Sequence, residues 1–271
     1  MNYYTIKRIY PWLYSIKDPD NVFCYLALGN KSALLYDTTF GIDSLPDAIR
    51  EVTNKSITVV LGHGHTDHAN GACQFDEVWL HERDFELYRQ HTSENLRRDY
   101  AIGMIESGSL MPDKFTVDAY VEAGRNENLR RLEIGQIFDL GGLHMEAVAM
   151  EGHTAGSVGL LAQEHRVLLT SDAANPHMWM FLEESLSIGQ YIAMLERVKE
   201  LDFDNFFIGH SDRSMPKSEL DKYINVACNA SMEKSTPYKV FPHLNGFLYQ
   251  EGETRIVFNE EKLRPSAALS S

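Results

Sequence analysis

The sequence predicts one α/β domain in which two similar β-sheets face each other and helices cover their outer sides. Both halves of the chain show the same order, a series of strand-like runs followed by an amphipathic helix, and this order suits stacked layers around one core. No low-complexity linker divides the halves, so residues 1–271 are expected to form a single domain. With 271 residues, of which 44% are hydrophobic, the chain can bury a core of that size.

The first half opens with β-rich runs that are separated by turn signals such as Asp-Pro and Gly-Asn. We expect these runs to pair as antiparallel neighbours, and they occupy residues 6–16, 22–29 and 31–38. A helix is predicted at about 44–53, where Ser44 can cap the first turn and an apolar stripe follows, formed by Leu45, Ala48, Ile49 and Val52. The run ITVVLG at 57–62 predicts a strand that is buried on both faces.

A short strand is predicted at 77–82, and a helical insertion follows at about 83–131. This insertion either carries a lid or packs onto the core through its aromatic and Met side chains, and for each residue taken singly packing is favoured. The second half repeats the order of strands and helices, with strand-like runs at 135–140, 143–150, 157–172 and 205–210, helices at about 187–200 and 217–230, and a final hairpin at 246–258.

Charge and composition disfavour several classes of partner. The 39 acidic and 25 basic residues give a formal charge of −14, which should repel a nucleic-acid backbone. The first 20 residues lack the apolar region of a signal peptide, and no run reaches the ~18 apolar residues of a membrane span. We therefore expect a cytoplasmic protein with a small-molecule substrate and no membrane partner, and self-association into a homo-oligomer stays open. The widely spaced Cys24, Cys73 and Cys228 suit reduced thiols.

The stretch LGHGHTDHANG, residues 61–71, carries His63, His65, Asp67 and His68 within six positions. With 11 His in the chain, this arrangement should arise by chance about once in a thousand such chains. It directly follows the buried strand at 57–62, and open α/β sheets place ligands just beyond the carboxyl ends of their strands. The stretch therefore predicts part of a metal site. Gly62 and Gly64 are expected to give its backbone the freedom to turn neighbouring imidazoles toward one point.

Three more candidate ligands, His153, Asp172 and His210, stand at the ends of later predicted strands. A lone His at a strand end makes an ordinary hydrogen bond about three times as often as it binds a metal. Loops at one edge of stacked sheets can converge, however, and the three residues share this placement. Two divalent ions need about three protein ligands each, a bridging carboxylate and a bridging water. The seven candidates supply the protein ligands that two ions need. One ion can take His63, His65 and His153, the other can take Asp67, His68 and His210, and Asp172 can bridge them.

The motifs HGHTDH, EGHTAGS, SDAA and IGH, in this order, resemble those of the metallo-β-lactamase-fold hydrolases. The resemblance implies a four-layer αββα sandwich and a dinuclear site with the ligand split given above. It also implies attack by a metal-bridging hydroxide on a small ester, thioester, lactone, amide or phosphodiester. Asp67 would then ligate one metal and orient the nucleophile. Imidazole donors suit two Zn²⁺ per chain, with Mn²⁺ or Fe as alternatives.

Other activities stay open beside this hydrolase. One alternative is a mononuclear iron oxidoreductase of the persulfide dioxygenase type, whose scaffold resembles HxHxDH and whose iron is held by two His and one Asp. Another is a β-lactamase-like activity, although class B1 and B2 enzymes use a Cys ligand and no Cys lies near the last three motifs here. A third is a non-catalytic relative in which the site only stabilises the fold. Acyl-homoserine lactonases would carry a Tyr where this chain has Asn175, and glyoxalase II uses a basic helical C-terminal region where this chain predicts a hairpin.

The segment after Asp172 supplies candidate substrate contacts. His177, Trp179 and Phe181 could line the mouth of the pocket, although packing against the next helix is equally expected for the two larger rings. His177 could donate a hydrogen bond to an oxyanion. Small residues beside the motifs, Ser157 and Ser171, are expected to serve the turns. A structural role is expected for the remaining histidines, His81, His91, His144, His165 and His243.

Overall fold

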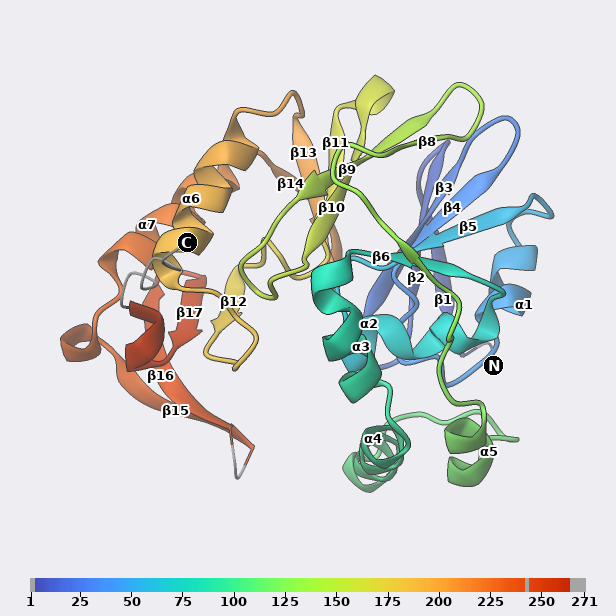
Figure 1. Cartoon of the computed structure of the whole chain (residues 1–271), viewed down its shortest axis with the longest axis horizontal. Coiled ribbons are helices and arrows are strands. Elements are labelled where there is room, and N and C mark those ends of the chain that lie inside the picture. Colours follow the sequence, from blue (N-terminus) through green and yellow to red (C-terminus); the bar gives the residue numbers. More distant parts are fainter. Residues whose placement is uncertain (1–2, 242–243, 264–271) are drawn as a thin grey trace.

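The two large β-sheets lie face to face, as predicted, and helices cover their outer sides in the computed structural model (Figure 1), which describes residues 3–241 and 244–263. The core between the sheets is apolar and includes Leu13 and Leu34 from the first sheet and Leu160 and Phe207 from the second. Tyr36 also links the sheets, because its hydroxyl donates to the Val158 carbonyl at 2.6 Å.

The first sheet is built in chain order. Its strands are β1 (Thr5–Tyr10), β2 (Leu13–Lys17), β3 (Phe23–Leu28), β4 (Ala33–Tyr36), β5 (Ile57–Val60), β6 (Val78–Leu80) and β7 (Leu129–Arg131). Strands β1 to β4 pair antiparallel, which confirms the prediction, and β4 to β7 pair parallel. The predicted run at 6–16 is wrong as one strand, because a turn at 11–12 folds it into the β1–β2 hairpin.

The second sheet has the order β14-β13-β11-β10-β9-β8. Its strands are β8 (Ile137–Asp139), β9 (His144–Ala149), β10 (Val158–Ala162), β11 (Val167–Leu169), β13 (Asn205–Ile208) and β14 (Ser211–Pro216). The predicted run at 157–172 is divided, since a short 3-10 turn at Gln163–His165 separates β10 from β11. A third, smaller sheet, which the sequence analysis missed, joins the predicted hairpin and is formed by β12 (His177–Met180), β17 (Thr254–Phe258), β16 (Leu244–Glu251) and β15 (Thr236–Phe241).

The helices form the two outer layers. The first sheet is covered by α1 (Leu45–Arg50), α2 (Thr66–Ala69), α3 (Phe85–His91), α4 (Glu94–Ser107) and α5 (Val117–Glu122), and the second by α6 (Ile188–Lys199) and α7 (Glu219–Asn229). Helix α1 begins as predicted, because the Ser44 hydroxyl accepts a hydrogen bond from the Asp47 amide at 3.2 Å. A capping box of Ser187 and Gln190 starts α6.

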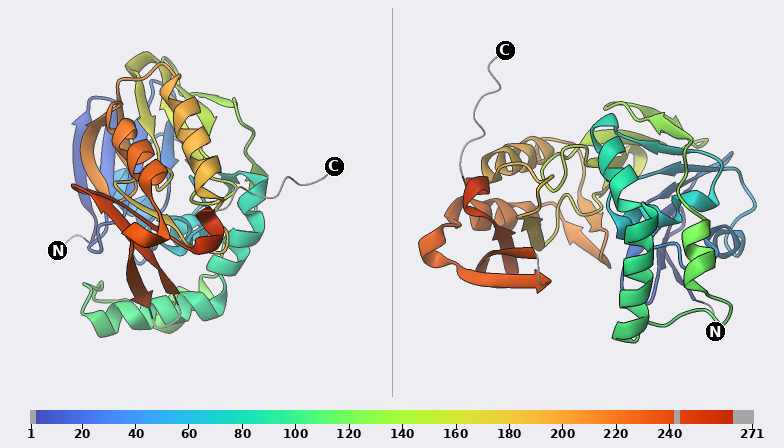
Figure 2. Two further views of the ribbon diagram at one scale, coloured as in Figure 1. Left: turned by 90° about the vertical axis from the view of Figure 1, so that its left-hand side faces the viewer. Right: turned by 60° about the horizontal axis from the view of Figure 1, so that its bottom comes forward.

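The predicted helical insertion at 83–131 holds α3, α4 and α5 but ends in a strand, β7. Figure 2 shows α4 and α5 side by side at one end of the molecule. Arg97 of α4 is fully buried there, and its guanidinium donates to the Tyr120 and Asn70 carbonyls at 2.8–3.1 Å. These bonds hold α4 against α5 and against the 3-10 helix Asn70–Gln74 that follows α2.

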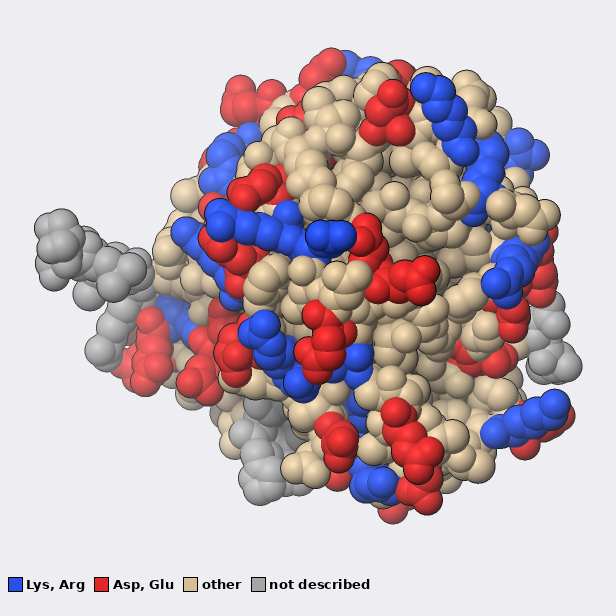
Figure 3. Space-filling model, turned by 45° about the vertical axis from the view of Figure 1, so that its right-hand side comes forward, with Lys and Arg blue, Asp and Glu red and all other residues tan. Residues whose placement is uncertain are grey.

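The surface mixes charges of both signs. Figure 3 shows Lys and Arg side chains interspersed with Asp and Glu side chains over the face that it presents. Many of these groups form ion pairs, such as Arg130 with Glu77 at 3.0 Å. Within the described residues, no helix is both long enough and apolar enough to cross a lipid bilayer.

Candidate metal centre

The structure brings all seven predicted ligands together at one edge of the sandwich. The first four follow β5, with His63 in the loop, His65 at the N-cap of α2, and Asp67 and His68 on α2 itself. The other three follow strands of the second sheet, namely His153 after β9, Asp172 after β11 and His210 after β13. Loops from both sheets therefore contribute, which is the convergence expected from the strand ends.

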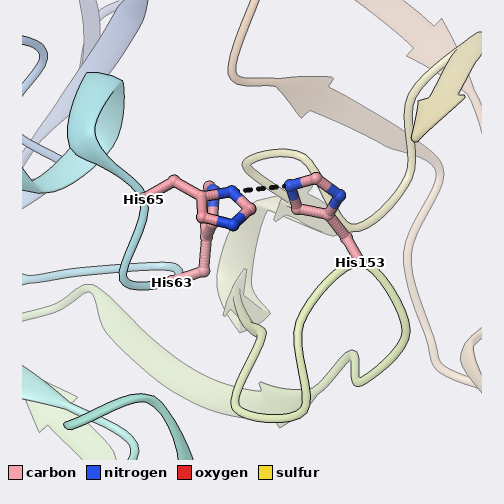
Figure 4. Close-up of side chains that lie close together, drawn as sticks. All are labelled: His63, His65 and His153. Atoms are coloured by element: carbon pink, nitrogen blue, oxygen red, sulfur yellow. Dashed lines mark hydrogen bonds between the residues drawn. The ribbon is translucent and has the colours of Figure 1, made fainter. Parts of the chain in front are cut away.

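A first cluster consists of His63, His65 and His153, all of them buried (Figure 4). The Nδ1 atom of His65 lies 2.9 Å from Nε2 of His153, and the His63 ring lies 4.7 Å and 5.1 Å from the rings of these two residues. One ring nitrogen from each residue can therefore point at a common centre. Three imidazoles in this arrangement form a donor set that suits a zinc-type cation.

A second cluster consists of Asp67, His68, Asp172 and His210. Oδ2 of Asp67 lies 3.3 Å from Nε2 of His68 and 3.6 Å from Nε2 of His210. Oδ2 of Asp172 lies 3.2 Å from Nε2 of His210, 3.6 Å from Nε2 of His68 and 4.0 Å from Nε2 of His153. Asp172 thus lies between the two clusters, where a bridging carboxylate would stand.

Three buried polar atoms of the clusters have no hydrogen-bond partner in the described chain, namely Nε2 of His63, Nε2 of His68 and Oδ1 of Asp172. A buried polar atom without a partner destabilises the folded protein by about 1–3 kcal/mol. Cations bound in the two clusters would supply a partner for all three atoms. The residues present therefore fit a pair of metal ions. Asp172 can reach both clusters, with Oδ2 4.0 Å from Nε2 of His153 and 3.2 Å from Nε2 of His210, as a bridging ligand of a dinuclear site requires.

A layer of outer hydrogen bonds orients the imidazoles. Nδ1 of His68 lies 3.1 Å from Oδ2 of Asp37, and Nε2 of His65 lies 2.6 Å from Oε1 of Glu184. Nδ1 of His153 lies 2.9 Å from the Trp179 carbonyl oxygen. Each acceptor holds the proton on the nitrogen that faces away from the cluster, so the other nitrogen keeps a free lone pair. This arrangement is typical of metal-binding histidines.

Asp37 and Ser171 face each other behind the second cluster. The Ser171 hydroxyl donates to Oδ2 of Asp37 at 2.6 Å and also lies 3.2 Å from Nδ1 of His63. The Gly62 amide donates to Oδ1 of Asp37 at 2.7 Å. Both Asp37 and Ser171 have a left-handed backbone, with φ of 65° and 49°. Ser171 therefore does more than serve a turn, because it joins Asp37 to the histidines.

Burial and neighbouring charges shift the pKa values of the acids and of the histidines in the clusters. Burial by itself would raise the pKa of Asp67 and Asp172, but His68 and His210 outweigh it and hold both pKa values below the ordinary range. Burial, together with the neighbouring His65, lowers the pKa of His153 to about 4. The carboxyls are therefore ionised and His153 is neutral at pH 7, which are the forms that bind a metal. Burial by itself would lower the pKa of His68 and His210, but Asp67 and Asp172 outweigh it and raise both, that of His210 to about 9, so a metal ion has to displace a proton from each of these two rings.

Glycines near the centre are required by close packing. A Cβ on Gly62 would lie 2.6 Å from the Tyr36 hydroxyl, and one on Gly64 would lie 2.8 Å from the Tyr88 amide nitrogen. Neither glycine has a positive φ, so the predicted backbone freedom is wrong as their explanation. A Cβ on Gly209 would lie 2.5 Å from Cε1 of His68 and 2.8 Å from Oδ1 of Asp172. Small residues therefore let the ligand loops approach each other.

A cavity of about 660 Å³ opens over the clusters. Of the predicted substrate contacts, His177 and Trp179 line it, and Phe181 does not. Phe181 is buried beside Trp179, with the ring centroids 5.3 Å apart, and its packing against the next helix stays a prediction. The remaining wall is mostly apolar or neutral and includes Phe40, Leu96, Tyr100, Asn175 and Leu182.

Four residues of the site were missed by the sequence analysis. His91 was assigned a structural role, but it lines the cavity and its ring lies 4.8 Å from that of His65. The others are acids, namely Asp37, Glu184 and the buried Asp84, which accepts hydrogen bonds from Gly64, Thr154 and Gly156. Asp37 stands at the end of a predicted strand, the same signal that identified His153. No comparable signal marks Glu184 in the sequence.

The other histidines lie elsewhere. His144 pairs with Glu164, and His165 stacks on Trp12 with the ring centroids 4.4 Å apart. His81 accepts a hydrogen bond from the Arg83 amide. These three keep the structural roles assigned to them, whereas His243 lies outside the described residues.

Comparisons with known proteins agree with this fold. The profile of the metallo-beta-lactamase superfamily matches residues 18–210. The human acyl-coenzyme A thioesterase MBLAC2 is 24% identical over 192 residues, which cover 65% of this chain and 67% of its own. BaeB of Bacillus velezensis, a probable polyketide biosynthesis zinc-dependent hydrolase, is 28% identical over 152 residues, which cover 55% of this chain and 54% of BaeB.

Among solved structures, the sec-alkylsulfatase Pisa1 from Pseudomonas sp. superposes with a TM-score of 0.61 at 15% identity. The match covers 83% of this chain and 41% of Pisa1, so the chain spans about two fifths of that enzyme. At this level of identity the similarity shows a shared fold.

Proposed function

The chain belongs to the metallo-beta-lactamase superfamily and is a hydrolase, and from this premise we propose that it cleaves acyl esters or thioesters at a dinuclear metal centre. The observation that carries the proposal is the pair of ligand clusters that share Asp172 on the floor of a largely apolar cavity. Two relatives support the type of reaction, since one is named an acyl-coenzyme A thioesterase and the other a probable zinc-dependent hydrolase of polyketide biosynthesis.

In this proposal the clusters hold two zinc ions. His63, His65 and His153 would bind one ion, and Asp67, His68 and His210 would bind the other, with Asp172 between them. When bound, the ions would lower the pKa of a coordinated water toward ~7 and polarise the substrate carbonyl. Imidazole and carboxylate donors in these numbers favour zinc over the oxygen-seeking Mg²⁺ or Ca²⁺.

The protein's own residues supply orientation and charge. Asp67 is ionised and reaches the cavity, so its carboxylate can accept a hydrogen bond from the attacking water and fix the direction of attack. Asp37 and Glu184 hold His68 and His65 in single tautomers. Asn175 and His177 line the wall, where they can donate hydrogen bonds to the substrate.

Hydrolysis needs no further reactant. A carbon–oxygen bond forms between water and the acyl carbon, and the bond from that carbon to the sulfur or oxygen of the leaving group breaks. One proton of the water passes to the departing thiolate or alkoxide, and the other passes to solvent when the acid product ionises and is released as a carboxylate. Phe40, Leu96, Tyr100 and Leu182 give the cavity an apolar wall against which an acyl chain can pack.

Metal analysis combined with a substrate panel tests the proposal. We expect two zinc ions per chain and hydrolysis of p-nitrophenyl acyl esters and acyl thioesters. The variant Asp67→Ala should keep its fold and lose at least about 100-fold in kcat/KM, whereas Asp113→Ala, which changes an exposed acid between α4 and α5, should match the wild type. One iron per chain together with oxygen consumption would refute the proposal. So would an Asp67→Ala protein that binds metal and hydrolyses the panel at the wild-type rate.

A further inference from the structure

We infer that the cavity selects acyl esters and thioesters whose leaving group carries no negative charge. This inference rests on the proposed hydrolase function and narrows it. It separates this chain from enzymes that act on thioesters of coenzyme A or glutathione, because those thiols carry phosphates or carboxylates. The charge of the wall is the basis for this selectivity.

The residues that line the cavity include acids and neutral groups, but no Lys or Arg among the residues that the structure describes there. Glu183 lies at the mouth, where it is exposed to solvent. Glu184 lies deeper, with Oε1 held 2.6 Å from Nε2 of His65. A phosphate or carboxylate in this space would meet carboxylates in place of the arginine fork that such groups ordinarily require.

Bound metal ions do not reverse this sign. Two divalent ions bring four positive charges, and four carboxylates stand against the histidines that would hold them, namely Asp37, Asp67, Asp172 and Glu184. The four negative charges of the carboxylates balance the four positive charges of the metal ions, even before a nucleophilic anion adds a further negative charge. Glu183 at the mouth then gives the entrance a net negative potential, which repels an approaching anion.

Two cations lie close to the wall, but neither lines the cavity. The Lys262 ammonium donates to the main-chain carbonyls of Glu183 and Ser185, and its charge acts on the carboxylates of Glu183, Glu184 and Glu261, which outnumber it. Arg255 pairs in register with His177 across β17 and β12 and is absent from the residues that line the cavity. Neither cation therefore offers an anchor inside the cavity.

The wall donates hydrogen bonds through a neutral group, His177. The Trp179 indole N–H donates to Nε2 of His177 at 3.3 Å, so Nε2 is an acceptor and the ring proton resides on Nδ1. Burial, with the nearby Arg255 adding to its effect, lowers the pKa of His177 to about 4. A neutral imidazole in this position suits an uncharged amide or carbonyl group of a leaving chain.

The apolar residues define where the acyl part lies. Leu96 and Tyr100 are one turn apart on α4 and face the cavity together with Phe40. Leu182 and Trp179 line it from β12 and the segment after it. These groups give the cavity apolar surface for an acyl chain, so the inferred substrate is apolar on the acyl side and neutral on the other.

A matched series of thioesters tests the inference. One acyl group, hexanoyl, is placed on N-acetylcysteamine, which is neutral, and on coenzyme A and glutathione, which are anionic. With the zinc-loaded wild type we expect kcat/KM to be at least about tenfold higher for the N-acetylcysteamine thioester. Adding salt should narrow this difference, because the repulsion is screened.

Reversal of the charge of Glu183 at the mouth of the cavity gives a second test of the inference. Glu183→Lys should raise kcat/KM for the coenzyme A and glutathione thioesters several-fold relative to the neutral one, and Glu183→Gln should produce a smaller shift in the same direction. Equal or faster hydrolysis of the anionic thioesters by the wild type would overturn the inference and leave the proposed function standing. Failure of the metal-loaded protein to hydrolyse any ester or thioester would overturn the proposed function itself.

Discussion

Replacing Asp37 by Asn should weaken metal binding at the second cluster while leaving the first cluster intact. Oδ1 of Asp37 accepts from the Gly62 amide at 2.7 Å, and Oδ2 accepts from the Ser171 hydroxyl at 2.6 Å and lies 3.1 Å from Nδ1 of His68. Asn at position 37 can still accept the hydrogen bond from the Gly62 amide, and Ser171 can rotate its hydroxyl to accept a hydrogen bond from the Asn side-chain amide. His68 is the one partner that has to change its tautomer.

The side-chain amide introduced by Asp37→Asn would donate to Nδ1 of His68 and move the ring proton to Nε2, the atom that has no partner in the described chain. A hydrogen bond to a charged acceptor contributes about 1.5–3 kcal/mol, which corresponds to a roughly 10- to 150-fold loss of affinity. The backbone should tolerate the change, because the φ of 65° at this position suits Asn as well as Asp.

Calorimetric titration of the metal-free variant with zinc, in competition with a chelator, measures this loss. We expect one of two binding events to weaken and the other to keep its wild-type affinity. Asp84→Asn is the matched control, since Asp84 is equally buried but its hydrogen bonds come from Gly64, Thr154 and Gly156; it should lower the thermal stability and retain both sites. Wild-type affinity at both sites in the Asp37→Asn protein would refute this account of His68.

Three further predictions concern packing, pH and metal removal. Gly209→Ala should lower the zinc content measured by elemental analysis, because the new Cβ would lie 2.5 Å from Cε1 of His68; a fully loaded variant would contradict this. Burial, with the charge of Asp20 adding to it, raises the pKa of Asp18 to about 7, so the ionised form is disfavoured in the folded state and wild-type stability should fall as pH rises from about 4 to about 7. Asp18→Asn keeps the acceptor for the Val22 amide. Its unfolding free energy should exceed that of the wild type by up to about 4 kcal/mol at pH 8 and match it at pH 4. A difference in unfolding free energy that stays constant from pH 4 to pH 8 would show that the pKa of Asp18 is not the cause of the difference. Removal of metal by a chelator should lower the melting temperature in calorimetry and its return should restore it, whereas identical melting curves would show that the clusters bind no metal.

The clustering of the seven candidate ligands could be predicted from the sequence because its signals are local. His63, His65, Asp67 and His68 follow one strand within six residues, and each later ligand also stands just past a strand. Parallel and paired strands bring such positions to one edge, so no long-range information is needed to expect their convergence. Glu184 differs, because its contact with His65 joins residues 119 positions apart and depends on how the loop after β12 folds back.

The strands that the sequence analysis missed share a physical property. β7, β12, β14 and β15 each form the edge of a sheet. Edge strands carry charged residues and Pro that protect them from pairing with other chains, as the charged Leu129–Arg131 and Ser211–Pro216 do here. These residue types weaken the hydrophobic alternation by which strands are predicted in β7, β14 and β15, whereas β12 carries neither type and is only four residues long.

Ser171 gives the protein a conflict between stability and activity. Asp adopts a left-handed backbone readily, but at Ser171, where φ is 49°, it costs of the order of 1–3 kcal/mol. Selection of variants for heat resistance in the absence of metal should therefore enrich Gly at position 171, since Gly relieves the strain. The same change would remove the hydroxyl that joins Asp37 to the histidines, so selection for turnover should restore Ser. Laboratory evolution under these two pressures would drive position 171 in opposite directions.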